Sequence, residues 1–231
     1  MNPSSLFGDT SPHTAQTRLN AVPAAPPADS GSTHLSGLNP SLMQDLLRFE
    51  PEHPPGHGLD LLEVVAAALR HNRDLTLLLH FDQQPLAMTI RPTARQLVCV
   101  LPRRQLLALR LSELRVMRVE PALPPLASEA PPQPLSPLIW ELALRGSRSQ
   151  LLPEIAGAAA YRATPGADLS ALDLKGTLVQ AVTRLRREPT PLREIASWPG
   201  FDADRAARLL NGLYLHAALI VTRSHPGAIS H

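Results

Sequence analysis

Proline is the residue that most constrains how this chain can fold. Seven of its 25 prolines lie between positions 121 and 137, and others crowd residues 21–27 and 51–55. Proline fixes φ and lacks a backbone N–H donor, so such stretches favour extended polyproline II geometry over helix or sheet interiors. We therefore predict a disordered tail at 1–40, a folded domain at 41–120, a proline-rich linker at 121–137 and a second domain at 138–231.

The composition is that of a globular protein with few specialised features. Hydrophobic residues make up 44% of the chain, which is enough for buried cores, and the formal net charge is only +2. The single cysteine, Cys99, excludes an intramolecular disulfide and a cysteine-rich zinc site, and its apolar neighbours predict a buried thiol. The N-terminus lacks a secretory signal and no apolar run is long enough to span a bilayer. We expect a cytoplasmic protein with no membrane partner.

Hydrophobic periodicity in the first domain predicts a small α+β fold. Apolar residues recur at helical spacing over 59–71, with Asp60 early in this segment, and 102–109 has the pattern of a short helix started by Pro102. Four further runs have the pattern of strands: 75–81, 86–90, 96–101 and 114–119. We expect these runs to form an antiparallel sheet of three to four strands.

A separate helix is predicted at 39–49, with Asn39 as its cap and Pro40 at its first position. Its apolar stripe either packs on its own domain, which we favour, or docks into the groove of a partner. The loop that follows holds His53 and His57, and its Pro/Gly content favours a solvated loop over a metal site.

The second domain is predicted to be mainly helical. Residues 138–144 form an apolar helix or strand, and 149–156 could be a short helix. The pattern then sharpens into helices at 170–187, 191–198 and 203–216, followed by a strand at 219–222. Thr190 and Asp202 stand where N-caps are expected, and Arg184, Arg186 and Arg187 suit the carbonyl-rich end of the first of these helices.

The segment PLREIASWPGFDADRAARLLNGLYLHAALIV places a short helix, a turn, a longer helix and an apolar strand in succession. Residues 170–223 therefore resemble a winged helix-turn-helix unit. The resemblance implies a second wing strand after 222, but the chain continues there as Arg223-Ser224-His225-Pro226-Gly227. The whole layout also resembles bacterial signalling regulators that are associated with small GTPases and roadblock-type proteins, and this likeness implies a protein partner of that kind.

Two observations count against DNA as the main partner. In a helix-turn-helix protein the third helix enters the major groove, and here its start carries Asp202 and Asp204 beside Arg205 and Arg208. From 171 to 231, eight basic and five acidic residues leave a net charge of +3, which is small for a protein that neutralises about six to ten phosphates.

The sequence contains none of the phosphate-binding, nucleophile-elbow or zinc-protease motifs that mark common enzyme classes. Its histidines are scattered, and His80 beside Phe81 fits a half-exposed strand residue better than a general base. We therefore expect no catalytic site, no cofactor and no metal.

We expect a non-enzymatic, cytoplasmic adaptor or regulatory protein that acts by protein–protein interaction. The candidate contact residues are Arg115 and Arg118 on the solvated face of the strand at 114–119, and Arg205 and Arg208 on the third helix. The alternative is a transcription regulator that uses this third helix on DNA.

Overall fold

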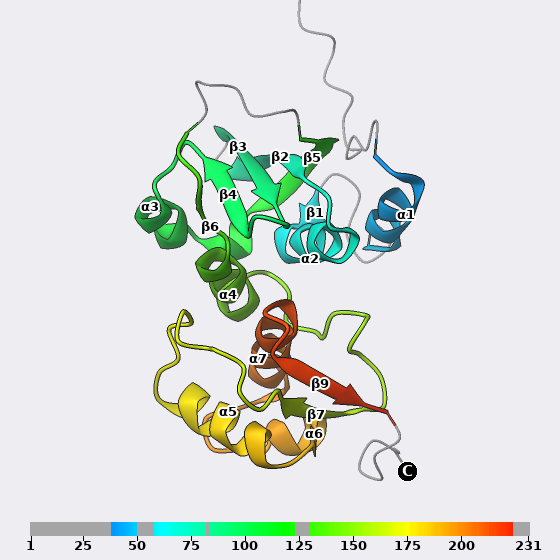
Figure 1. Ribbon diagram of the computed structural model, residues 1–231, viewed down its shortest axis with the longest axis vertical. Helices are drawn as coiled ribbons and strands as arrows, with labels where there is room; N and C mark the ends of the chain where they lie inside the picture. The colour runs from blue at the N-terminus through cyan, green and yellow to red at the C-terminus, as the bar shows by residue number, and fades with distance from the viewer. Residues whose placement is uncertain (1–37, 50–57, 82–83, 123–129, 224–231) are drawn as a thin grey trace, which may run out of the picture.

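The computed structural model describes residues 38–49, 58–81, 84–122 and 130–223 and has the expected α+β fold. Its strands form two antiparallel sheets, one of six strands in the order β1-β5-β2-β3-β4-β6 and one of three in the order β8-β7-β9. Figure 1 shows α4 and α7 between the two sheets.

The first part of the described chain builds the larger sheet and its helices. Its elements are α1 (Pro40–Phe49), β1 (Leu59–Asp60), α2 (Leu61–His71), β2 (Leu75–Phe81), β3 (Gln84–Arg91), β4 (Gln96–Cys99), α3 (Arg103–Ala108), a 3-10 turn (Leu111–Glu113), β5 (Arg115–Pro121) and β6 (Gln133–Pro134). The second part contains α4 (Ser136–Arg145), β7 (Ala160–Ala163), α5 (Thr177–Arg187), β8 (Thr190–Pro191), α6 (Leu192–Ile195), α7 (Ala203–Leu215) and β9 (Leu219–Thr222).

Alternating burial organises the larger sheet. In β2, Leu75, Leu77 and Leu79 are buried. Leu78, which lies between two of them, and His80, which follows Leu79, are exposed on the other face. The sheet has two more strands than the upper limit of the prediction because the two-residue strands β1 and β6 extend its edges. Strands this short carry no period that a sequence pattern could reveal.

The helices α1 and α2 pack together beside this sheet (Figure 1). Asp60 caps α2, because its Oδ1 accepts hydrogen bonds from the amides of Leu62 at 2.8 Å and Glu63 at 3.3 Å. Leu42 and Leu46 of α1 are fully buried, so the stripe of this helix packs within the chain, as favoured above.

The proline-rich range 121–137 contributes to the fold at both of its ends. Pro121 closes β5, Gln133 and Pro134 pair with β4 as an edge strand, and Pro137 lies in the first turn of α4. The side chain of Gln133 also donates to the Leu101 carbonyl at 2.9 Å. The middle of the predicted linker, 123–129, lies outside the described residues.

The second half corrects several local predictions. The first helix of the predicted three starts at Thr177 instead of residue 170, after Gly176 with φ of 53°. Thr190 does not cap α6: it lies in β8 and pairs with Tyr161 of β7. The helix α6 has only four residues, because Pro191 belongs to β8 and the chain turns after Ile195. Asp202 does cap α7, since its Oδ1 accepts from the Arg205 amide at 2.7 Å.

The strand β9 confirms the predicted strand at 219–222, but its partner lies upstream of the three helices. β9 pairs with β7, which in turn pairs with β8. The sequence resemblance implied a second strand after β9, and residues 224–231 lie outside the described part of the chain. Within the described residues, the central strand of this small sheet is β7.

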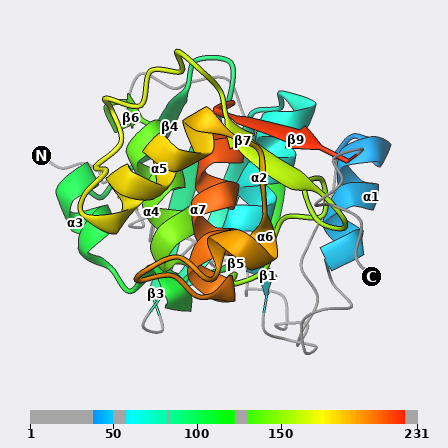
Figure 2. The same ribbon diagram turned by 90° about the horizontal axis from the view of Figure 1, so that it is seen from below.

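The helix α7 joins the two halves. It contacts α4 on one side and α6 and β9 on others, and Figure 2 shows α5, α6 and β7 laid over it. At the α4–α7 contact, a Cβ on Gly212 would lie only 2.7 Å from Cζ3 of Trp140. The buried Asn211 accepts a hydrogen bond from the Leu152 amide and donates one to the Gln150 carbonyl, each at 2.9 Å.

A buried polar junction fixes residues 146–152 against α2. Glu63, whose side chain is 1% exposed, pairs with Arg148, which also donates to the Leu151 carbonyl at 2.8 Å. Ser147 donates to the second carboxylate oxygen of Asp60. Together with Asn211, these contacts tie α2 and α7 to one segment, and the buried apolar side chains of both halves form one continuous cluster.

Three predictions fall wholly or largely on residues outside the described ranges: the tail at 1–40, of which 1–37 is undescribed, the loop with His53 and His57, and the C-terminal end from 224. Across the described residues, no helix combines the length and apolarity needed to cross a membrane. Cys99 is buried as expected, and this burial raises the pKa of its thiol.

Candidate functional site

The structure places the four arginines singled out by sequence in two separate regions. Arg115 and Arg118 lie on β5 of the larger sheet, away from α7 (Figure 1). Arg115 donates to the carbonyls of Ser112 at 2.8 Å and Leu114 at 2.9 Å, and Arg118 pairs with Glu120 at 2.5 Å. These contacts are local, and they build no common site with α7.

The two arginines of α7 hold neighbouring elements in place. Arg208 donates to the carbonyls of Gly146 at 2.8 Å and Leu144 at 3.3 Å, at the end of α4. Arg205 donates to the Gly200 carbonyl at 2.7 Å and to Thr177 Oγ1 at 2.9 Å. Arg205 therefore clamps the start of α7 to the start of α5, beside the pocket described next.

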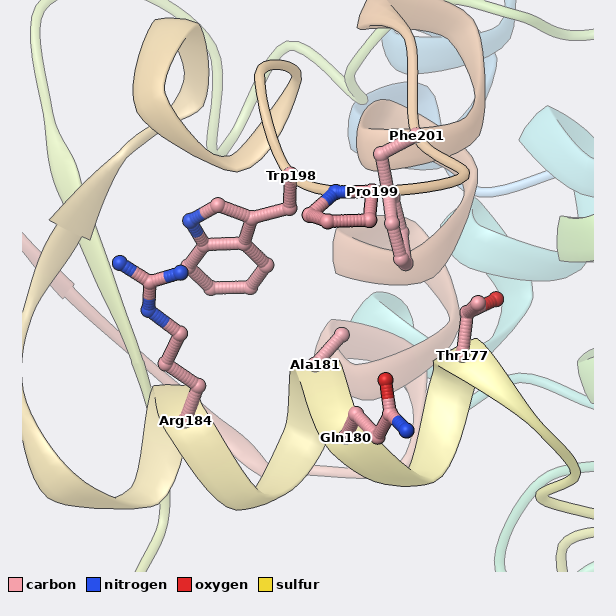
Figure 3. A pocket seen from close by; sticks show the side chains of 7 residues that line it. All are labelled: Thr177, Gln180, Ala181, Arg184, Trp198, Pro199 and Phe201. Atoms are coloured by element: carbon pink, nitrogen blue, oxygen red, sulfur yellow. The ribbon is translucent and has the colours of Figure 1, made fainter.

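A pocket of about 210 Å³ opens between α5 and the turn that joins α6 to α7 (Figure 3). One face of α5 forms its floor, because residues three and four apart lie on the same side of a helix. The turn supplies an apolar wall. The lining residues are Thr177, Gln180, Ala181, Arg184, Trp198, Pro199 and Phe201.

The turn that carries the wall is fixed by its own sequence. The helix α6 ends at Ile195, and the turn after it contains Pro199 and Gly200. Gly200 adopts φ of +77°, which an L side chain rarely takes. A Cβ at Gly200 would also lie 3.2 Å from Cγ2 of Thr177. The rings of Trp198 and Phe201 meet edge to face with their centroids 6.2 Å apart. This geometry holds the aromatic wall against α5.

An arginine stands at each end of the pocket. The guanidinium carbon of Arg184 lies 4.6 Å from the centroid of the Trp198 ring, and Figure 3 shows this side chain reaching from α5 to the indole. At the other end, the guanidinium carbon of Arg205 lies 5.2 Å from the centroid of Phe201. The pocket therefore combines an apolar wall with the positive charge of Arg184 in its lining, and Arg205, which contacts Phe201 but does not line the pocket, adds a second positive charge nearby.

The side chain of Arg184 stays half-exposed despite its contact with Trp198. Its nearest acidic partner is Glu194, whose Oε1 lies 3.7 Å from Arg184 Nη2, and the two side chains are 49% and 48% exposed. A pair this long and this solvated is worth little, about 0–1 kcal/mol. The positive charge of Arg184 is thus open to a second anionic group.

Compared with protein-family models, with curated proteins and with solved structures, the chain matches none of them. Among the residues that the structure describes, no group of three or more histidine, cysteine, aspartate or glutamate side chains could hold a metal ion.

Trp198, Phe201 and Arg184 were not among the contact residues predicted from the sequence. Arg184 was expected at the carbonyl-rich end of a helix, where an arginine needs no further explanation. A usable signal was nevertheless present: Trp198 and Phe201, two of only eight aromatic residues, flank Pro199 and Gly200 in one short turn. Aromatic side chains are costly to expose to water, so two of them in one turn are expected either to pack on the protein or to form a binding surface.

Proposed function

We propose that this protein is a non-enzymatic, cytoplasmic adaptor that binds a protein partner through the pocket between α5 and the α6–α7 turn. The observation that supports this most is the aromatic wall faced by the half-exposed Arg184. Aromatic residues and arginine are the side chains that contribute most to protein–protein interfaces.

The size of the pocket favours a protein segment over a small-molecule cofactor. Sites for small molecules and cofactors commonly enclose about 300–1,000 Å³, whereas this one encloses about 210 Å³. Such a space suits one or two side chains of a partner, with the rest of the interface spread over neighbouring surface.

The geometry does not favour the alternative, a transcription regulator that uses α7 on DNA. In α7 only Ala203, Asp204 and Arg205 are exposed; Arg208 and Tyr214 are partly buried, and the other residues are buried against α4 and the elements around it. A recognition helix must present a face to the major groove. Here that face is packed inside the protein, and Arg208 donates to the carbonyls of Leu144 and Gly146.

The resemblances given by the sequence suggest where to look for the partner. A winged-helix-like unit joined to an α+β domain makes small GTPases and roadblock-type proteins the first candidates to test. In this proposal the α5–α6 surface of the unit, and not its third helix, contacts the partner.

The proposal is tested by affinity capture from a nuclease-treated cell extract with the full-length protein as bait. We expect specific proteins to be captured by the wild type and by Arg187→Glu, but to be lost with Arg184→Glu. Arg187 is a matched control, because it is an exposed arginine of the same helix that does not line the pocket. Capture that Arg184→Glu leaves unchanged, or no captured protein at all, would contradict the proposal.

A further inference from the structure

The charges around the pocket define what kind of side chain it can accept. Arg184 lines the pocket and Arg205 lies beside it, and the guanidinium groups of both rest on aromatic rings of the wall. Between them the lining is apolar at Ala181, Pro199 and Phe201. A basic ligand would meet two like charges, whereas a carboxylate placed next to an apolar side chain would match both features.

We propose that the pocket binds a peptide segment of the partner in which an aspartate or glutamate lies next to a large apolar residue. This inference rests on the proposed function and specifies the chemistry of the partner. The carboxylate pairs with Arg184, and the neighbouring apolar side chain lies against Trp198 and Phe201.

Arg184 can accept this carboxylate without losing a strong existing bond. Its present pairing with Glu194 spans 3.7 Å in solvent, longer than the 2.7–2.9 Å of a charge-assisted hydrogen bond. A partner carboxylate at that shorter distance, with the apolar side chain excluding water, interacts more strongly than Glu194 does. The contact of Arg184 with Trp198 holds the guanidinium at the pocket, so little side-chain freedom is lost on binding.

Gln180 adds a second polar contact on the rim. It projects from α5 between Thr177 and Arg184 along the same helix face, and it is exposed (Figure 3). Its amide nitrogen can donate a hydrogen bond to a backbone carbonyl of an extended peptide, and its amide oxygen can accept one from a backbone N–H. The arrangement therefore offers a carboxylate partner, an apolar cavity and a backbone contact along about one turn and a half of helix.

The surroundings favour an isolated carboxylate over a polyanion such as DNA. Glu194, Asp202 and Asp204 lie on the elements that border the pocket, at α6 and at the start of α7. A chain of phosphates laid across this surface would meet these three carboxylates. A single acidic side chain that pairs with Arg184 would meet Glu194, with which it competes for that guanidinium, but would not have to run past Asp202 and Asp204.

The test is a selection of random peptides displayed on phage against the full-length wild-type protein. We expect the enriched peptides to carry Asp or Glu beside Leu, Ile, Met, Phe or Trp. The strongest peptide is then synthesised with its acidic residue intact and with the corresponding amide, and both are titrated against the protein. Loss of the carboxylate should weaken binding by roughly ten- to a hundredfold, as expected for a hydrogen bond between charged groups.

Three protein variants locate the contact. Arg184→Gln should weaken binding of the acidic peptide by a similar factor and should not change the affinity for the amide peptide. Gln180→Trp, a change at an exposed rim position, should block both peptides. Arg187→Gln, the matched control, should bind both as the wild type does. The circular dichroism spectrum and urea midpoint of each variant show that it is folded.

The outcomes separate this inference from the proposed function. Enriched peptides that are blocked by Gln180→Trp but contain no acidic residue overturn the inference and leave the pocket as a protein-binding site. Enriched peptides that neither Arg184→Gln nor Gln180→Trp weakens overturn both. Failure to enrich any peptide, or displacement of the acidic peptide by a duplex DNA of random sequence at physiological salt, also overturns the inference.

Discussion

The two ring nitrogens of His216 both face backbone carbonyl oxygens. Nδ1 lies 2.8 Å from the oxygen of Gly212, and Nε2 lies 3.2 Å from that of Ser136, which begins α4. A neutral imidazole can donate through only one of its nitrogens, whereas the imidazolium could donate through both. Burial lowers the pKa of His216 below its ordinary value of 6.5, and the nearby charge of Arg95 lowers it further, against the two carbonyls that raise it.

This balance predicts a pH-dependent stability at His216. Because its pKa is lower in the folded than in the unfolded protein, the neutral ring stabilises the fold above pH 6.5. That contribution is lost as the pH falls below 6.5, at no more than about 1.4 kcal/mol per pH unit. Asparagine can donate to Gly212 in place of Nδ1 and does not titrate. We therefore expect the free energy of unfolding in urea to fall more for the wild type than for His216→Asn between pH 7.5 and 5.

The comparison with His216→Asn cancels the contributions of the other histidines. His80→Gln, at an exposed position of β2, supplies a second control that should keep the wild-type difference. An advantage of the wild type that grows on acidification would contradict the prediction, since it would mean that the imidazolium, donating to both carbonyls, is the preferred form in the folded protein.

At the scale of elements, the sequence predicted best where a single periodicity ran through one segment. The alternation of β2 and the caps Asp60 and Asp202 were enough to locate their elements. The strand β7 was missed because three of its four residues are buried, so it shows no alternation. The helix α6 was predicted too long at both ends: Pro191 pairs with β7 in β8, and residues 196–198 form a turn after Ile195. The pairing of Thr190 and Pro191 with β7 cannot be read from local sequence.

The packing of α4 on α7 leads to a prediction for Gly212. A Cβ there would lie 2.7 Å from Cζ3 and 2.9 Å from Cε3 of Trp140, and 3.4 Å from the Cβ of Ala143. Replacing a helical glycine by alanine normally stabilises a helix by about 1 kcal/mol. Here the overpacking, at about 1–3 kcal/mol, should outweigh that gain. We expect Gly212→Ala to lower the free energy of unfolding, measured by urea denaturation.

A double-mutant cycle isolates the contact that causes this loss. Trp140→Phe removes the outer ring atoms that the new Cβ would meet, so Gly212→Ala should cost less in that background than in the wild type. Equal costs in both backgrounds would show that Trp140 is not the obstacle, and a stabilised Gly212→Ala would show that the two helices do not pack as closely as described.

For the whole molecule, the sequence predicted two domains divided at 121–137. The candidate site could be predicted less well than the fold, because it depends on which side chains α5 and the α6–α7 turn bring together. Arg205 and Arg208 look alike in sequence, yet one borders the pocket through Phe201 and the other donates to carbonyls at the end of α4. The apolar pattern of α4 shows that this helix is buried, but not that it contacts both α2 and α7.

These contacts of α4, with the polar junction of Glu63, Arg148 and Asn211, predict that the two halves unfold together. Leu77 is fully buried in β2, in the larger sheet, whereas both tryptophans lie in the second half. Leu77→Ala should destabilise the protein by about 2–5 kcal/mol. In a cooperative molecule, the urea midpoint followed by tryptophan fluorescence should shift as much as the midpoint followed by far-ultraviolet circular dichroism.

Thr183→Ala, on the exposed face of α5, should shift neither midpoint appreciably. If the fluorescence midpoint stayed in place while the dichroism midpoint moved, the halves would unfold separately, and partner binding at α5 could not stabilise the larger sheet.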